Sequence, residues 1–398
     1  GGSSLAEARD RSGVGRVILT GKPPAAPGQG GTLVAHRPIP TTLAELTPDW
    51  LTEALRAAGH LKDAALAAVQ VEPIGQGVGI LCQLARLTLT YDRPVPAAPA
   101  SLVAKMPTAD AQTRGMVALF RFYEREVRFY SEVAPLVDVC TPRCYYHDFD
   151  SASGDFILLL EDLSACRLGD QLAGASMEEV RLAVAELAKL HAAWWNSPRL
   201  EAFSWMPVAN DPINKAGLAL YPQAWPAFLE RFGHALPEVV RRTGERLGAQ
   251  VGAILDRFMT APRTICHGDY RLDNLFFGGA GAPLTVIDWQ IAVRSVGTYD
   301  VGYFMSQSVD PDVRRSEEMD VLRAYHRMLV ERGVQGYSFD DCLTDYRWTL
   351  LFCFCYPVMG GGLGDLSNER GYALARTMME RSAAAITDWE AWKLLETL

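Results

Sequence analysis

The spacing of hydrophobic residues changes once along this chain of 398 residues, near residue 163, and that change limits the possible folds more than any other feature. Between residues 69 and 107 apolar and polar side chains alternate, as in Arg86–Tyr91, and Phe156–Leu160 is an apolar run of strand length. Such patterns are typical of an antiparallel sheet. After residue 163 apolar residues recur at the spacing of helices, in segments near 176–195, 236–259, 316–332, 340–356 and 368–395.

The sequence therefore predicts an α+β chain, with a small antiparallel-sheet lobe followed by a large, mostly helical lobe. Residues 1–40 are rich in Gly, Pro, Ser and Ala and show no periodicity, so we expect a flexible N-terminal tail there. Residues 41–163 would form the sheet lobe and residues 164–398 the helical lobe. We expect one strand pair within the helical lobe, at 274–277 and 284–288.

Composition excludes several classes of protein. Hydrophobic residues make up 49% of the chain and charged residues 21%, which is ordinary for a globular protein with a sizeable core. A formal net charge of −9 argues against a nucleic-acid partner, because such proteins usually carry a basic face. The eight scattered cysteines are best explained as reduced thiols, which favours a cytoplasmic location. The apolar stretches are too short for a membrane span. We expect a monomer or homodimer.

The segment Ile265–Asn274, followed by Val286–Gln290, carries the strongest chemical signal. Phosphoryl transfer needs one carboxylate to orient the attacking hydroxyl, and carboxylate and amide oxygens to hold Mg²⁺ against the phosphates. Asp269, Asn274 and Asp288 supply these groups on a loop and a hairpin short enough to converge. Each residue alone could be a turn former, but the joint pattern favours a phosphotransferase site.

His267-Gly-Asp-x-x-x-x-Asn274, with Ile287-Asp-Trp after it, resembles the signature of the aminoglycoside phosphotransferase and choline kinase superfamily. Glu161–Leu163, Leu187–Ala192 and Asp288–Gln290 resemble more particularly its ecdysteroid-kinase-like and acyl-CoA-associated branches. The resemblance extends over most of the chain, from about residue 70 to residue 310. It implies a protein-kinase-like fold of two lobes and a kinase that acts on small molecules.

Carried onto this sequence, the resemblance implies that Asp269 is the catalytic base and that His267 organises its loop. It implies that Asn274 and Asp288 are Mg²⁺ ligands. Asp300 resembles a position that supports the catalytic loop, whereas His191, on an apolar helix face, is better explained as a core histidine.

The resemblance also implies an ATP-binding lysine on a strand, and Lys105 in Leu102–Met106 fits that position. Its ion-pair partner is expected on the next helix. Glu126 has suitable neighbours, Glu124 is a rival, and both could equally be solvated helix charges.

Gly75, Gly77 and Gly79 form a glycine-rich segment ahead of a predicted strand. A dinucleotide-binding fold would need a helix at that place, so the order favours a strand–turn–strand flap over nucleotide phosphates. A plain hairpin turn is the alternative. By analogy with a kinase hinge, adenine is expected against the backbone from Glu161 to Leu163.

The sequence thus predicts an ATP- and Mg²⁺-dependent phosphotransferase that acts on a small-molecule hydroxyl. One alternative is a catalytically silent module that binds a nucleotide or metabolite. Another is a metal-dependent hydrolase using His267, Asp269 and Asp288, which lacks the further histidines of a two-metal cluster. For the acceptor, an apolar alcohol or hydroxyacyl compound is favoured by aromatic and Met residues that core packing could also explain: Tyr303, Phe304, Met305, Trp348, Phe352, Phe354 and Met359.

Overall fold

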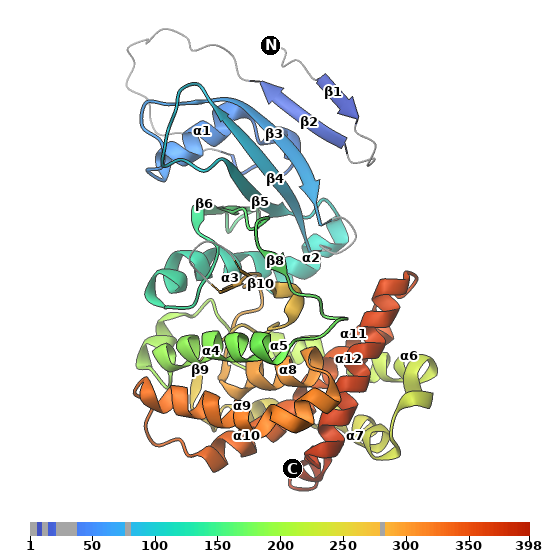
Figure 1. Cartoon of the computed structure of the whole chain (residues 1–398). Coiled ribbons are helices and arrows are strands. Elements are labelled where there is room, and N and C mark those ends of the chain that lie inside the picture. The colour runs from blue at the N-terminus through green and yellow to red at the C-terminus, as the bar shows by residue number, and fades with distance from the viewer. Residues whose placement is uncertain (1–5, 10–14, 21–37, 76–80, 279–282) are drawn as a thin grey trace. The chain divides into compact units, whose positions relative to one another are not determined.

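The computed structural model describes residues 6–9, 15–20, 38–75, 81–278 and 283–398, and divides into two compact units (Figure 1). The first, here called the sheet unit, comprises Gly1–Val133 and Pro142–Ser164. The second, here called the helical unit, comprises Ala134–Thr141 and Ala165–Leu398. Gly77 and Gly79 of the glycine-rich segment lie outside the described residues.

The sheet unit contains a seven-stranded antiparallel sheet with the strand order β1-β2-β3-β4-β5-β7-β6. Its strands are β1 (Ala6–Arg9), β2 (Gly15–Thr20), β3 (Leu66–Ile74), β4 (Cys82–Tyr91), β5 (Ser101–Pro107), β6 (Cys144–Phe149) and β7 (Phe156–Glu161). Alternate residues of β4, such as Leu87 and Leu89, are buried while Thr88 between them is exposed. The two-residue period of the sequence therefore marks the face of the sheet that packs against the core.

Helix α1 (Pro48–Ala57) covers part of that core. It begins where the sequence predicts, because the Thr47 hydroxyl accepts a hydrogen bond from the Trp50 amide and Pro48 occupies the first helical position. Leu51 and Leu55, one turn apart, are fully buried in the same cluster as the apolar residues of β3, β4 and β5.

Two expectations for the sheet unit differ from the structure. Two segments of residues 1–40 form strands, β1 and β2, and β2 pairs with β3. The sequence of β2 contains Val17, Ile18 and Thr20, the β-branched residues that strands favour. Apolar spacing predicts one helix over 112–134, but two form, α2 (Ala111–Leu119) and α3 (Phe122–Arg128). The break falls at Arg121, whose φ of 57° ends the regular helix.

The helical unit contains α4 to α12, and its long helices match the predicted segments. The bounds are α4 (Met177–Trp194), α5 (Pro212–Leu218), α6 (Tyr221–Phe232), α7 (Glu238–Phe258), α8 (Thr298–Ser308), α9 (Pro311–Glu331), α10 (Phe339–Cys353), α11 (Cys355–Leu363) and α12 (Glu369–Asp388). The Ser176 and Glu179 capping box starts α4 as predicted. Helix α8 has no polar face, because every one of its residues is buried.

Two small antiparallel sheets lie in the helical unit, where we expected a single strand pair. One has the order β11-β10-β8 and the other pairs β12 with β9. Their bounds are β8 (Arg167–Leu168), β9 (Arg263–Cys266), β10 (Leu275–Phe277), β11 (Leu284–Val286) and β12 (Val293–Val296). Strands of two to four residues are too short to produce a recognisable period, which explains why three of them were not predicted.

An antiparallel sheet in the first unit and a mostly helical second unit confirm the predicted α+β class. Among the described residues, no helix is both long enough and apolar enough to cross a bilayer.

Candidate active site

Residues 267–274, here called the Asp269 loop, connect β9 to β10 in the helical unit. The hairpin of β10 and β11 then brings the chain back to Asp288, and the amide of Ile287 donates to the Asn274 carbonyl over 3.0 Å. The structure thus brings the two motifs together, as their spacing in the sequence suggests.

Asp300 on α8 anchors the start of the loop. Its carboxylate accepts hydrogen bonds from the amides of His267 (2.7 Å) and Gly268 (2.9 Å), and the side chain is fully buried. A buried carboxylate that receives two backbone N–H groups fixes both peptide units, because leaving either group unpaired would be costly.

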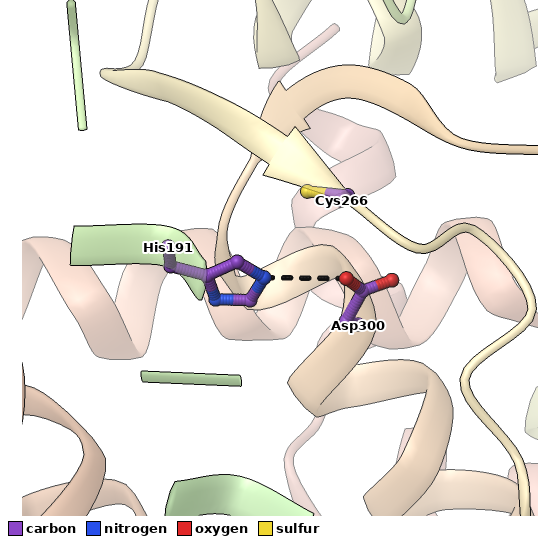
Figure 2. Close-up of side chains that lie close together, drawn as sticks. All are labelled: His191, Cys266 and Asp300. Atoms are coloured by element: carbon purple, nitrogen blue, oxygen red, sulfur yellow. Dashed lines mark hydrogen bonds and ion pairs between the residues drawn. The ribbon is translucent and has the colours of Figure 1, made fainter. Parts of the chain in front are cut away.

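His191 on α4 holds Asp300 in turn. Figure 2 shows its ring pointing at the Asp300 carboxylate, with Nε2 3.2 Å from Oδ2. Its Nδ1 lies 2.8 Å from the Tyr325 hydroxyl, so both ring nitrogens are engaged. Cys266, also in Figure 2, completes a group close enough to bind a metal ion. Burial, reinforced by the Asp300 charge, raises the pKa of the Cys266 thiol well above its usual value. The protonated thiol donates a hydrogen bond to the Val296 carbonyl. The three residues therefore form a hydrogen-bonded cluster that supports the Asp269 loop.

His267 joins the loop to the segment that carries Asp288. Its Nε2 donates to the Ile287 carbonyl over 2.8 Å, and its Nδ1 accepts from the Asp269 amide at 3.2 Å. These partners assign a neutral imidazole protonated on Nε2. The side chain is fully buried against Trp289, which suits the organising role predicted for it.

Gly268 is required by two features of the loop. Its φ is 89°, and a Cβ atom there would lie 2.5 Å from the Ile291 carbonyl oxygen. A side chain would therefore strain the backbone and push against a peptide group that cannot rotate away.

Asp269 is held by three side chains from its own unit. The Tyr303 hydroxyl donates to Oδ1 over 2.8 Å, Asn274 Nδ2 donates to Oδ2 over 3.1 Å, and Arg271 Nε lies 3.4 Å from Oδ1. Burial alone would raise the pKa of Asp269, but the Arg271 charge and the hydrogen bonds outweigh it and lower this pKa below its usual value. The carboxylate is therefore ionised at neutral pH, with about a quarter of the side chain (24%) exposed.

Asn274 and Asp288 offer the oxygen donors that Mg²⁺ prefers. Asn274 uses its amide nitrogen for the carbonyl (2.8 Å) and the carboxylate of Asp269, which directs its amide oxygen elsewhere. Asp288 has a φ of 67°, an uncommon conformation for a residue with a side chain and one that often occurs at functional positions. The donor set fits a magnesium ion.

In the sheet unit, Lys105 on β5 pairs with Glu126 on α3. Its Nζ lies 2.8 Å from Oε1 and 2.7 Å from Oε2 of Glu126, and the two residues are only 7% and 1% exposed. The rival Glu124 pairs instead with Arg121 and Arg128 on the helix surface.

Of the other predicted nucleotide contacts, Gly75 follows β3 with a φ of 69°, which favours glycine. Glu161 ends β7, and its side chain accepts from the Arg143 amide at 3.1 Å. Leu163 is half-buried in the segment that follows.

Sequence reasoning did not predict the contacts of two residues with Asp269, although Tyr303 was named as a possible acceptor residue. Tyr303 lies one helical turn after Asp300 on α8, so the i, i+3 spacing was an available signal. Arg271 stands between Asp269 and Asp273, and its alternation with two carboxylates in the motif could have identified it.

Comparison with known proteins places the chain in a kinase-like family. A family model described as the ecdysteroid kinase-like family matches residues 76–334, about two thirds of the chain. No curated protein matches.

Three solved structures are similar to this chain at low sequence identity. Aminoglycoside 2'-phosphotransferase-IIIa, in its GDP complex, is 17% identical with a TM-score of 0.48, over 85% of this chain and 98% of the other. Choline kinase from Cryptosporidium parvum Iowa II is 12% identical with a TM-score of 0.46, over 83% and 89%. A choline/ethanolamine kinase family protein from Mesorhizobium loti is 12% identical with a TM-score of 0.43, over 82% and 91%. Assignment to a family depends on the family model alone.

Proposed function

The chain belongs to the ecdysteroid kinase-like family, and from this premise we propose that it transfers the γ-phosphoryl group of ATP to a hydroxyl of a small molecule. The observation that carries the proposal is the state of Asp269. Its carboxylate is ionised, partly exposed and fixed by Tyr303 and Asn274, as an acceptor of a hydroxyl proton must be.

In the proposed reaction, Asp269 accepts a hydrogen bond from the acceptor hydroxyl and orients its oxygen toward the γ-phosphorus. A new P–O bond forms to that oxygen while the bond between the γ-phosphorus and the bridging oxygen breaks, and ADP leaves with the bond's electron pair. The hydroxyl proton passes to Asp269 and then to solvent. Most of the acceleration in such a reaction comes from position and charge, which the hydrogen-bonded loop supports.

The same proposal assigns roles to the residues that would bind Mg²⁺ and the nucleotide. Asn274 and Asp288 would hold Mg²⁺, which would supply positive charge to the phosphates. Lys105 would contact the nucleotide phosphates, and its ion pair with Glu126 would position it. Gly75, Glu161 and Leu163 would contact the nucleotide through their backbone, as would Gly77 and Gly79 beyond the described residues.

For the acceptor we propose an apolar alcohol or hydroxyacyl compound. Tyr303, which contacts Asp269, packs edge-on against half-buried Tyr356, with ring centroids 4.8 Å apart. The negative charge of Asp269 faces the Arg271 guanidinium, which makes this carboxylate a weaker attractant for a polycationic acceptor.

The decisive experiment compares the wild type with Asp269→Asn and the exposed control Asp320→Asn. ADP release is measured with MgATP over a panel of hydroxylated sterols, hydroxyacyl thioesters, aminoglycosides and choline-like amines, and ATP affinity is measured by calorimetry. We expect acceptor-dependent ADP release in the wild type and control, its loss in Asp269→Asn, and ATP binding in all three.

Transfer by Asp269→Asn at a rate near that of the wild type would refute the part assigned to this residue. ATP binding without transfer to any acceptor would favour the silent binding module instead. A protein that binds no ATP would overturn the proposal altogether.

A further inference from the structure

Arg271 lies between two carboxylates of the Asp269 loop yet makes no close hydrogen bond to either. Its Nε is 3.4 Å from Asp269 Oδ1, and its Nη1 is 3.5 Å from Asp273 Oδ2. The Nε atom is buried and has no hydrogen-bond partner among the described residues. About a quarter of the side chain (23%) is exposed.

Two buried arginines of the helical unit are bonded quite differently. Arg294 donates from Nε to the Met206 carbonyl (2.9 Å) and from Nη1 to the Leu200 carbonyl (3.0 Å). Arg381 donates to the Gln171 carbonyl at 2.7 Å. These side chains use short, directed bonds to backbone oxygens, as a structural arginine should. Arg271 is held by charge alone and keeps its directed donors available.

Asp273, which lies beside Arg271, is itself held by other groups. Its Oδ1 accepts the Gln171 amide at 3.1 Å and lies 3.8 Å from Arg370, whereas Oδ2 faces Arg271. The neighbouring carboxylates, Asp269 foremost, raise the pKa of Arg271 well above its usual value, so the guanidinium is always charged. A charged, partly exposed group with unsatisfied donors is prepared for an additional anion.

We propose that Arg271 binds the terminal phosphate of the nucleoside triphosphate. This rests on the proposed function, in which Asp269 directs a hydroxyl at that same phosphorus. A guanidinium 3.4 Å from the Asp269 carboxylate is placed to bind oxygens of the group under attack, whereas the β- and α-phosphates lie one and two bridging oxygens further away, respectively. The planar fork of arginine suits two phosphate oxygens at once.

The test compares the binding of two nucleotides and needs no acceptor. Calorimetry with Mg²⁺ measures the affinities for ADP and for the non-hydrolysable triphosphate AMP-PNP. The proteins are the wild type, Arg271→Gln, Arg271→Lys and Arg376→Gln, a matched control on the exposed surface of α12, where Arg376 pairs with Glu380. Thermal unfolding of each variant checks that it is folded.

We expect Arg271→Gln to weaken AMP-PNP binding about tenfold to a hundredfold, the range for a lost hydrogen bond to a charged group, and to change ADP binding less than twofold. Arg271→Lys should recover part of the loss, because it keeps the charge without the fork. Arg376→Gln should match the wild type.

An equal loss for both nucleotides, or no loss for either, would overturn the inference while leaving the proposed function standing. Unchanged affinity for both nucleotides would also be expected if Arg271 bound an anionic group of the acceptor. A wild type that binds neither nucleotide would overturn the proposed function itself, so the two failures are distinct.

Discussion

The candidate residues of the sheet unit and of the helical unit are held in place in different ways. Lys105 and Glu126 are held by a buried ion pair between a strand and a helix. The Asp269 loop depends on many hydrogen bonds, and several of them fix backbone atoms, as Asp300 fixes His267 and Gly268. A side-chain pair positions one charge, whereas a bonded backbone positions every side chain that the loop carries. The two regions should therefore respond differently to single substitutions.

The largest effect is expected from Asp300→Ala. It leaves two buried N–H groups and His191 without their partner, which should lower the free energy of unfolding by about 3–5 kcal/mol. Urea denaturation measures this loss, with Asp320→Ala as control, since that residue is 76% exposed and should cost less than about 0.5 kcal/mol. A loss below about 1 kcal/mol for Asp300→Ala would show that the loop does not depend on this anchor.

The next effect tests the ion pair of the sheet unit. Lys105→Met leaves the Glu126 carboxylate buried without its cation and should cost about 3 kcal/mol. The double variant Lys105→Met/Glu126→Leu should recover most of that loss, because two apolar residues can replace a buried pair at little cost. The readout is urea unfolding of the two single variants and the double variant. If the loss of unfolding free energy in the double variant equals the sum of the losses in the two single variants, Lys105 and Glu126 contribute independently and not as a pair. The contrast drawn between the two units would then fail.

A third prediction concerns a carboxyl of the helical unit that lies outside the loop. Burial raises the pKa of Asp345 on α10 from 3.8 to about 6, against the opposing effect of Arg257. The folded protein therefore holds this proton more tightly than the unfolded chain. The resulting stabilisation is fully present below pH 4 and is lost as the pH rises toward 6.

Asp345→Asn should consequently change stability little at pH 4 and raise the free energy of unfolding at pH 8 by about 2 kcal/mol. The amide oxygen can still accept from the Tyr337 hydroxyl, which lies 3.1 Å from Asp345. Urea unfolding curves of the wild type and Asp345→Asn at pH 4 and pH 8 measure this change in stability. Equal stability at pH 8 would mean that the ionised carboxylate is fully compensated in the folded state.

The smallest effect is expected from Tyr303→Phe. One hydrogen bond to Asp269 is lost, while Asn274 and Arg271 still hold the carboxylate, so stability should fall by only about 1 kcal/mol. Urea denaturation beside Asp300→Ala gives the comparison directly. A cost equal to that of Asp300→Ala would contradict a loop supported by many bonds.

The sequence was sufficient for features that depend on neighbouring residues. Period-two alternation predicted the central strands, and capping residues predicted the starts of α1 and α4. Helical geometry also separates Glu126 from Glu124, because buried Tyr123 and Val127 lie on the same side of α3 as Glu126. The sequence left Glu124 as a rival, and the ion pair between Lys105 and Glu126 in the structure decides for Glu126.

Features that join distant segments could not be predicted in the same way. His191 was expected to be a core histidine, and it is fully buried, but its partner Asp300 lies 109 residues further along the chain. Helix α8 is buried on every side and so shows no amphipathic pattern. The short distance between Arg271 and Asp269 was hidden for a different reason, since a loop has no period from which side-chain directions can be read.

One feature of the chain bears on how the protein is synthesised. Residues 134–141 interrupt the sheet unit but belong to the helical unit, where Cys140 accepts the Val286 amide and donates to Glu186. As the chain leaves the ribosome, β6 and β7 can pair at once, whereas residues 134–141 must wait for about 145 more residues before all these partners exist. A nascent chain halted near residue 200 should therefore expose this segment to proteases while the strands on either side of it are already protected.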